Sequence, residues 1–402
     1  MINNLNYLLN DLQTDTNLIH FNNAGASLMP KQVLDSQIEH LKLESQIGGY
    51  EAAQQQEQKI AAVYSSVAKL INCKETEVAL VENATIGWLS AFKSIQFKRS
   101  DIILTAECEY GSNYLAYLQL QQEKGVEISV IPSNKHGEIC IQSLADMLKK
   151  DTDNRIKLIS ITHIPTNSGL VNPIKEIGEL ARQYQVLYLV DACQTAGQLP
   201  IDVRSIQCDF LTATARKYLR GSRGAGFLYV REAIIDKSNP PLIDVRSALW
   251  TSPNSYQFRA DAKRFENWEN NYSALLGMGC AIDYALAIGI DNIAARNKLL
   301  ADNLREQLAL IRCVTVQDIG RDKCAIVTFS VTGIPSLVIK NSLNKDNINV
   351  SCSSPSSTLI DATKRNLPDV VRASIHYFND DQQIDIFIAC LTKIIKQYLI
   401  ED

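Results

Sequence analysis

The stretch TATARKYLRGSRGAGFLYV, residues 212–230, places one lysine, Lys217, between two apolar runs that are typical of β-strands. Basic residues and glycines surround this lysine, so one interpretation is a solvated basic turn. The other is a lysine held in place for covalent chemistry. The polar residues that end the neighbouring strands decide between the two.

Short apolar runs alternate with longer amphipathic stretches from about residue 60 to residue 231. The runs that predict strands are EVALVE (77–82), DIILTA (101–106), EISVIP (127–132), IKLISITH (156–163), VLYLVDA (186–192), DFLTAT (209–214) and GFLYV (226–230). Predicted helices are ATIGWLSAFKSI (84–95), GSNYLAYLQLQQEKG (111–125) and PIKEIGELARQYQ (173–185), the last with proline in its first turn. This alternation predicts an α/β fold whose mostly parallel sheet is covered by helices on both faces.

The pattern changes after about residue 280. One long helix is predicted over residues 277–311, followed by a strand, CAIVTFSV (324–331), and a terminal helix over residues 381–400. These elements predict a smaller C-terminal α/β domain. We place the large domain at residues 20–280 and the small domain at residues 1–19 and 281–402.

Composition limits the classes of partner. The 402 residues carry a formal net charge of −4, which gives no general attraction to nucleic acid or to anionic membranes. The ten cysteines form no CxxC pair and no Cys/His cluster, so neither a metal site nor a disulfide framework is predicted. The first 23 residues lack the features of a secretion signal, and no apolar run approaches membrane-spanning length. We expect a soluble, cytoplasmic protein with small-molecule or protein partners.

Polar side chains follow three neighbouring strands of the predicted sheet. In an open α/β sheet the ligand lies beyond the carboxyl ends of the strands. The side chains predicted there are His163 and Thr166, then Asp191 and Gln194, and finally Thr214, Arg216 and Lys217. A single aspartate at a strand end is common, but its combination with a lysine in the next strand's exit loop is more specific.

A lysine that forms a Schiff base, together with a carboxylate for a pyridinium nitrogen, is what pyridoxal phosphate requires. The cofactor accepts electrons only while its ring nitrogen stays protonated, and Asp191 suits that role. Lys217 would carry the cofactor aldehyde and move the α-proton of the substrate. Arg216 and Thr214 would hold the phosphate.

The phosphate would also be held at the start of the predicted helix in ENATIGW (82–88). A helix N-terminus favours an anion, so the backbone amides from Ala84 onward and the Thr85 hydroxyl are predicted to contact it.

Five motifs together resemble the class V aminotransferases of pyridoxal phosphate fold type I. They are FNNAGASLMP (21–30), DACQTAGQLPIDV (191–203), ARKYLRGSRGAGFLYVR (215–231), RFENWE (264–269) and VRASIHYFN (371–379). The resemblance covers about residues 20–380 and is strongest to the branch near isopenicillin-N epimerase, cysteine desulfurases and C–S lyases such as hercynylcysteine sulfoxide lyase. It implies a fold type I enzyme with a seven-stranded sheet in its large domain, acting as a homodimer with shared active sites.

The resemblance implies further roles near the cofactor. Lys217 and Asp191 keep the roles given above, and Gln194 faces the phenolic oxygen of the cofactor. Tyr110 falls where the family places an aromatic ring or an imidazole over the cofactor, although a core aromatic is the alternative. His163 would assist Gln194, or else be satisfied by the backbone. Thr166 stands where desulfurases usually carry asparagine, which leaves its contact open.

The substrate site is also implied by the resemblance. Arg372 matches the arginine that clamps the substrate α-carboxylate, with an exposed arginine as the alternative. Ala26 and Tyr50 are predicted substrate-binding residues. Tyr50 belongs to GGYEAA (48–53), which, like RFENWE, looks like a loop that reaches the partner's active site. The turn RGSRG (220–224) would shape the mouth of the cofactor site.

One departure from the desulfurase pattern concerns sulfur transfer. Persulfide-forming desulfurases carry an acceptor cysteine upstream of the carboxylate-binding arginine, but that position falls near Ser356 here, and Cys352 lies four residues earlier. A reactive thiolate needs exposure and a lowered pKa. Cys352 is therefore either an acceptor or a small side chain on a strand edge.

Three reactions share these residues: C–S β-elimination, transamination and, less favoured, epimerisation. A protein of this fold without catalysis would be expected to lack Lys217 or Asp191, and both are present. We predict a homodimeric pyridoxal phosphate enzyme that acts on an α-amino acid, with C–S β-elimination slightly ahead of transamination.

Overall fold

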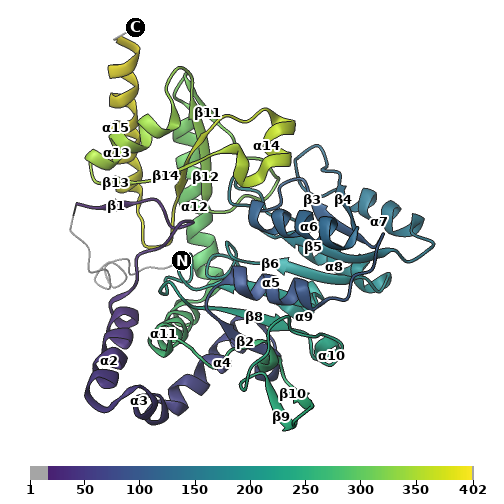
Figure 1. The fold of residues 1–402 in the computed structure, drawn as a ribbon. Helices are drawn as coiled ribbons and strands as arrows, with labels where there is room; N and C mark the ends of the chain where they lie inside the picture. Colours follow the sequence, from purple (N-terminus) through teal and green to yellow (C-terminus); the bar gives the residue numbers. More distant parts are fainter. Residues whose placement is uncertain (1–16, 401–402) are drawn as a thin grey trace.

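The computed structural model describes residues 17–400 (Figure 1). The predictions for the N-terminal segment up to residue 16, including that part of the small domain, lie outside these residues. In Figure 1 a large lobe carries the labels β2 to β6 and β8, and a smaller lobe above it carries β11 to β14.

A seven-stranded sheet forms the large lobe, in the order β2-β8-β7-β6-β5-β3-β4. Its strands are β2 (Val78–Val81), β3 (Ile102–Ala106), β4 (Glu127–Ile131), β5 (Ile156–Thr162), β6 (Leu187–Asp191), β7 (Phe210–Thr214) and β8 (Gly226–Val230). All seven predicted strands are present, and the predicted α/β fold with a mostly parallel sheet is confirmed.

The strand β8 is the exception to the parallel order, because it runs antiparallel to both β7 and β2. Parallel neighbours need a crossover of a dozen or more residues, usually a helix. Only residues 215–225 join β7 to β8, and they contain no helix. The chain therefore turns back sharply at this point, and the turn carries Lys217.

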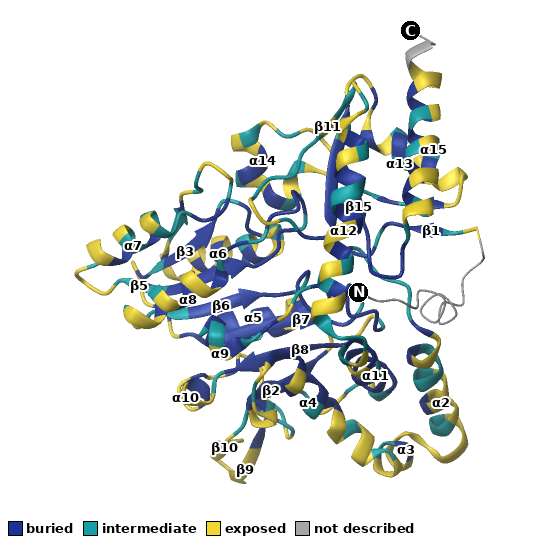
Figure 2. Ribbon diagram, turned by 180° about the vertical axis from the view of Figure 1, so that it is seen from behind, coloured by how far each residue is buried: buried dark blue, intermediate teal, exposed yellow. Residues whose placement is uncertain are grey.

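Helices cover both faces of this sheet, and its strands are buried on both sides (Figure 2). Along β6, Leu189 packs with Trp88 and Phe92 on one face, whereas Tyr188 and Val190 pack on the other. This alternation is the two-residue period of a strand. The covering helices are α4 (Glu57–Ile71), α5 (Ala84–Ser94), α6 (Gly111–Lys124), α7 (Ile141–Lys150), α8 (Ile174–Gln183) and α11 (Tyr272–Ile288).

The small lobe is built on an antiparallel four-stranded sheet in the order β11-β12-β15-β14. Its elements are α12 (Ile290–Ala309), β11 (Val314–Val316), β12 (Ile326–Val331), α13 (Ser336–Lys345), β14 (Ser351–Ser353), α14 (Leu359–Arg365), β15 (Val370–Ser374) and α15 (Asp381–Ile400). The predicted strand CAIVTFSV and the terminal helix are both found. The short strand β1 (Ile19–His20) pairs with β13 (Ile348–Asn349), which ties the start of the described chain to this lobe.

The single helix predicted over residues 277–311 is wrong. The chain forms two helices, α11 and α12, which are bent by 79° relative to each other. Gly289 separates them with a φ of 90°, and its amide closes α11 onto the carbonyl of Ala285. Only glycine adopts this conformation readily, so the break is local. Most of α11 packs on α2 (Lys31–Ile47) and α4 of the large lobe, and the predicted domain boundary at residue 280 stays a prediction.

The remaining elements lie at the edges of the large lobe. They are α2 (Lys31–Ile47), α3 (Gly49–Gln55), α9 (Val203–Ile206), α10 (Glu232–Ile235), the hairpin β9 (Ala248–Ser252) with β10 (Ser255–Phe258), and the 3-10 turns η1 (Glu75–Glu77), η2 (Ala262–Phe265) and η3 (Pro355–Thr358). Within residues 17–400, no single helix is long and apolar enough to cross a membrane; only α11 and α12 taken together meet that test.

Candidate active site

A cavity of about 420 Å³ opens at the carboxyl ends of the central strands. It is lined by Glu82, Asn83, Ala84, Thr85, Tyr110, Cys193, Thr214, Arg216, Lys217, Arg223 and Gly224. Six of the predicted cofactor residues thus share one cavity, here called the strand-end cavity. Two larger hollows open elsewhere on the large lobe, but Lys217 lines neither.

Lys217 lies in the turn that follows β7, where the Lys217 carbonyl accepts the Arg220 amide at 2.9 Å. The turn presses against a second turn at Gly197, whose φ is 88°; a Cβ there would lie 2.4 Å from the backbone of Tyr218. Burial lowers the pKa of Lys217, and the positive charges of Arg216 and Arg372 act in the same direction. A larger share of neutral amine makes the lysine a better nucleophile.

Asp191 ends β6 and is buried. Its Oδ1 accepts the amide of Cys193 at 2.9 Å, and its Oδ2 accepts Nδ2 of Asn113 at 3.1 Å. Both oxygens are held by donors, so the orientation of the carboxylate is fixed. This suits a group that must face a protonated ring nitrogen.

Gln194 is buried one turn beyond Asp191. Its Nε2 donates to the carbonyl of Ala24 at 3.2 Å, whereas its Oε1 is buried without a hydrogen-bond partner. An unpaired buried amide oxygen is costly. It therefore fits a site that a polar ligand completes.

Arg372 lies on β15 and is only 7% exposed, which excludes the alternative of an exposed arginine. Its Nη1 donates to Oγ1 of Thr166 at 2.6 Å and to the Thr166 carbonyl at 3.2 Å. Its Nε is buried without a partner, and no ion pair is formed by Arg372 within residues 17–400. A buried guanidinium without a carboxylate is prepared to receive an anion. Thr166 orients this arginine.

His163 and Tyr110 occupy different environments. His163 is buried, its Nδ1 lies 2.9 Å from Oγ1 of Thr195, and burial lowers its pKa to about 3, so the ring is neutral. His163 therefore bonds the side chain of Thr195, and not that of Gln194 as predicted. Tyr110 precedes α6 and is 37% exposed, so it lines the strand-end cavity and is not a core aromatic.

The loop around Ala26 is tied to Arg216. Arg216 donates from Nη1 to the Gly25 carbonyl, and its own carbonyl accepts the Ser27 amide at 2.8 Å. Tyr50 is not brought to the cavity: it lies on α3 and is 75% exposed. The prediction that GGYEAA is a loop is wrong, because α3 begins at Gly49.

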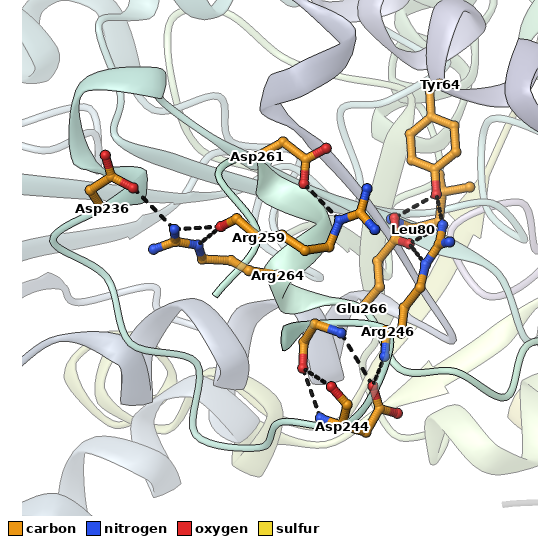
Figure 3. Close-up of polar contacts among 10 residues, drawn as sticks. Tyr64, Leu80, Asp236, Asp244, Arg246, Arg259, Asp261, Arg264 and Glu266 are labelled. Atoms are coloured by element: carbon orange, nitrogen blue, oxygen red, sulfur yellow. Dashed lines mark hydrogen bonds and ion pairs between the residues drawn. The ribbon is translucent and has the colours of Figure 1, made fainter. Parts of the chain in front are cut away.

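Two residues of RFENWE, Arg264 and Glu266, are buried and make polar contacts within their own chain (Figure 3). The reach of this segment to the partner's active site stays a prediction. Glu266 accepts hydrogen bonds from Tyr64, Arg246 and the amide of Leu80. We call this set, with Arg264, the Glu266 network.

Arg223 and Gly224 of the predicted turn RGSRG line the strand-end cavity. Three residues near the site escaped the sequence interpretation: Cys193 lines the cavity, and Glu109 and Asn113 lie behind Asp191. Cys193 stands between two predicted cofactor residues. Glu109 and Asn113 flank Tyr110 and are four residues apart, the spacing of one helical turn. The position of these residues next to predicted cofactor residues, and the helical spacing, could have identified them from the sequence.

The segment expected to hold a sulfur acceptor is folded against α6. The carbonyl of Ser356 comes so close to Gly111 that a Cβ there would lie 3.0 Å from it. Cys352 lies on β14, and burial, assisted by the charge of Asp369, raises its pKa. A raised pKa keeps the thiol protonated, and a protonated thiol is a poor nucleophile.

Known proteins resemble the chain over nearly its whole length. The family model "Aminotransferase class-V" matches residues 19–387. A probable cysteine desulfurase of Pyrococcus abyssi is 27% identical over 393 residues, which is 96% of each chain. The apo structure of a cysteine desulfurase from Thermococcus onnurineus superimposes with a TM-score of 0.89 at 24% identity, covering 98% of each chain. A cystine C–S lyase in complex with its reaction product, cysteine persulfide, gives a TM-score of 0.83 at 22% identity, covering 94% of this chain and 97% of its own.

Proposed function

The chain belongs to the class-V aminotransferase family, whose pyridoxal-phosphate-dependent members include cysteine desulfurases, and from this premise we propose that it is a C–S β-lyase acting on a cysteine-type α-amino acid. The observation that carries the proposal is a pair of cations without an ion pair in the described chain, the half-buried Lys217 and the buried Arg372. Arg372 bonds Thr166 in the loop after β5, and the amide of His163 in the same loop donates to the carbonyl of Asp191 at 3.0 Å, so this arginine lies beside the strand ends that carry the site.

The residues of the strand-end cavity suit pyridoxal phosphate. When bound, this cofactor stabilises the negative charge that forms at the α-carbon of an amino acid. Lys217 would hold the cofactor aldehyde until the amine of the substrate displaces it, and its freed amine would then take the α-proton. Asp191 would keep the ring nitrogen protonated, and the second hydrogen on Nε2 of Gln194 would donate to the phenolic oxygen. The phosphate contacts fall to Thr85, Thr214, Arg216 and the first amides of α5, from Ala84.

The substrate would be oriented by its carboxylate. Arg372 binds that group, held in place by Thr166, and so presents the α-hydrogen to Lys217. Ala26 lies in the loop that is joined to Arg216 and would face the substrate from there. Tyr110 and Cys193 line the wall.

Elimination is favoured over transfer to an enzyme thiol because Cys352 is not activated. The proton leaves the α-carbon to Lys217, the Cβ–S bond breaks, and sulfur departs with the electron pair as a thiolate or persulfide. Hydrolysis of the remaining three-carbon unit gives pyruvate and ammonia. Transamination is the second candidate, because the same residues serve its first proton transfer.

We also propose a homodimer, on the ground of exposed apolar side chains around the hairpin β9–β10. Leu242, Val245, Leu249 and Trp250 are 67–75% exposed. Tyr50 on α3 is exposed to the same extent and is a candidate for the same interface or the partner's site. Light scattering on the purified protein tests the dimer. The cytoplasmic location stays a prediction.

The test of the reaction is to load the protein with pyridoxal phosphate and incubate it with cystine and with cysteine. We expect pyruvate to accumulate over many turnovers and sulfide or persulfide to appear in solution. The cofactor should remain unchanged. Conversion of the cofactor to pyridoxamine phosphate without pyruvate would establish transamination instead. Persulfide trapped on Cys352 would establish an enzyme-bound acceptor.

A further inference from the structure

Glu109 is a buried carboxyl group that the proposed reaction does not use. It lies between β3 and α6 and is 3% exposed. Its oxygens accept five hydrogen bonds, from the amides of Tyr110 and Thr162, the hydroxyls of Thr105 and Thr162, and Nδ2 of Asn113. Within residues 17–400 it forms no ion pair. A carboxylate surrounded by donors alone is arranged to be ionised.

Asn113 connects Glu109 to Asp191. Its Nδ2 donates to Oε1 of Glu109 at 2.9 Å and to Oδ2 of Asp191 at 3.1 Å. An amide nitrogen has two hydrogens, and here each is directed to a carboxylate. Because both oxygens contact one nitrogen, they lie within about 6 Å of each other. Two carboxylates therefore share one amide directly behind the strand-end cavity.

The two carboxylates of this bridge differ in the charges that act on them. Burial raises the pKa of Glu109 to about 7, against the hydrogen bonds from Thr162 and Asn113, and the charge of Asp191 raises it further. The titratable groups that Glu109 acts on are Tyr117 on α6 and Cys108 in its own loop, and burial keeps both protonated. The charge of Asp191, in contrast, also interacts with Lys217 and with the Cys193 thiol.

This inference rests on the proposed function: we propose that Glu109, acting through Asn113, is a positioning residue that fixes the Asp191 carboxylate and strengthens its hold on the protonated ring nitrogen of pyridoxal phosphate. Glu109 keeps the Asn113 amide turned so that it donates to Asp191. Its negative charge also increases the affinity of the neighbouring carboxylate for a proton or a cation. In the loaded protein the protonated ring nitrogen would add a positive charge beside Asp191.

The first experiment follows the ring nitrogen in the loaded protein. Pyridoxal phosphate labelled with ¹⁵N at the ring is bound to the wild type, Glu109→Gln and Glu138→Gln, and its NMR shift is titrated with pH. Glu138 is the matched control, because it is a buried carboxylate of the large lobe that bonds Arg321 and Asn134. We expect the nitrogen of Glu109→Gln to lose its proton at a pH about one unit lower. The control should titrate like the wild type, and an unshifted Glu109→Gln would overturn the proposal.

The second experiment needs no cofactor. Melting temperatures of the apoprotein at pH 8 are measured for Glu109→Gln, Asp191→Asn and the double variant. Two carboxylates that share one amide should couple, so the double change should differ from the sum of the single changes. Additive changes would overturn the coupling. A wild type that fails to bind the labelled cofactor would instead defeat the proposed function, while the cycle still reports on Glu109 and Asp191.

If the Glu109→Gln variant does not fold, Asn113→Ala tests the bridge in its place. This change leaves both charges in place and removes the bridge. Cofactor should then dissociate about tenfold more readily, which corresponds to one hydrogen bond to a charged group. Unchanged cofactor binding would show that the bridge is dispensable and would contradict the proposal.

Discussion

The strand-end cavity and the Glu266 network differ in whether their charged side chains have partners. In the network, Glu266 is bonded by Tyr64, Leu80 and Arg246, and Arg264 donates to the carbonyls of Arg259 and Ile235 and to Asp236 (Figure 3). In the cavity and beside it, Lys217 and Arg372 form no ion pair within the described part of the chain, and Gln194 keeps an unpaired oxygen.

The difference separates structural polar groups from binding groups. A buried charge whose partners are complete holds segments together, and breaking such a set is expensive. A buried charge without its partner reduces the stability of the free protein and is retained where a ligand supplies the partner. Arg264 is thus assigned to the stability of the fold, and Arg372 is proposed to bind an anion.

Among these variants, the replacement of Lys217 should cause the largest loss of turnover. Lys217→Ala should reduce turnover by about 10²- to 10⁴-fold, because no other group takes the α-proton. Borohydride reduction followed by mass spectrometry should find no cofactor attached. The melting temperature of the apoprotein should not fall, since the removed lysine has no ion pair. Lys175→Ala on the surface of α8 is the control, and retained turnover in Lys217→Ala would refute the assignment.

Arg372→Ala should raise KM for the amino acid by about 10²-fold with a smaller change in kcat, because a buried charged contact to the carboxylate is lost. Apoprotein stability should stay the same or rise, because an unpaired buried cation is removed. Steady-state kinetics and thermal unfolding measure the two effects. An unchanged KM would remove Arg372 from the substrate site.

Glu266→Ala tests the other side of the comparison. The change leaves Arg246 and the Tyr64 hydroxyl without their carboxylate partner, so the free energy of unfolding should fall by about 3 kcal/mol. Turnover per folded molecule should stay within about twofold of the wild type. Chemical denaturation and active-site titration separate the two quantities. A large loss of turnover in well-folded protein would place the network in the reaction.

Cys352→Ser should have the smallest effect. The thiol is partly buried with a raised pKa, so replacing it should leave both pyruvate formation and the released sulfur product unchanged. Product analysis on the purified variant checks this. Loss of sulfur release with pyruvate intact would identify Cys352 as an acceptor and move the protein toward the persulfide-forming desulfurases.

Local pattern in the sequence determined the strands of the large sheet and the position of its chemistry. Apolar runs separated by turn residues predict strands from local sequence alone, without knowledge of the tertiary contacts. Parallel strands bring their carboxyl ends to one edge of the sheet. Asp191, Thr214 and Lys217 could therefore be placed together without a structure. The family resemblance added Arg372, which lies far from these residues along the chain.

Tertiary structure alone decided which polar groups are paired. Helical periodicity continues across Gly289, so it could not predict the bend between α11 and α12. The family resemblance suggested a loop at residues 48–53, where α3 begins at Gly49. The partners of Arg372 and Glu266 come from distant segments, as do the two carboxylates that Asn113 joins. Pairing depends on contacts between residues far apart in sequence, and no local pattern encodes whether a buried charge is satisfied or left for a ligand.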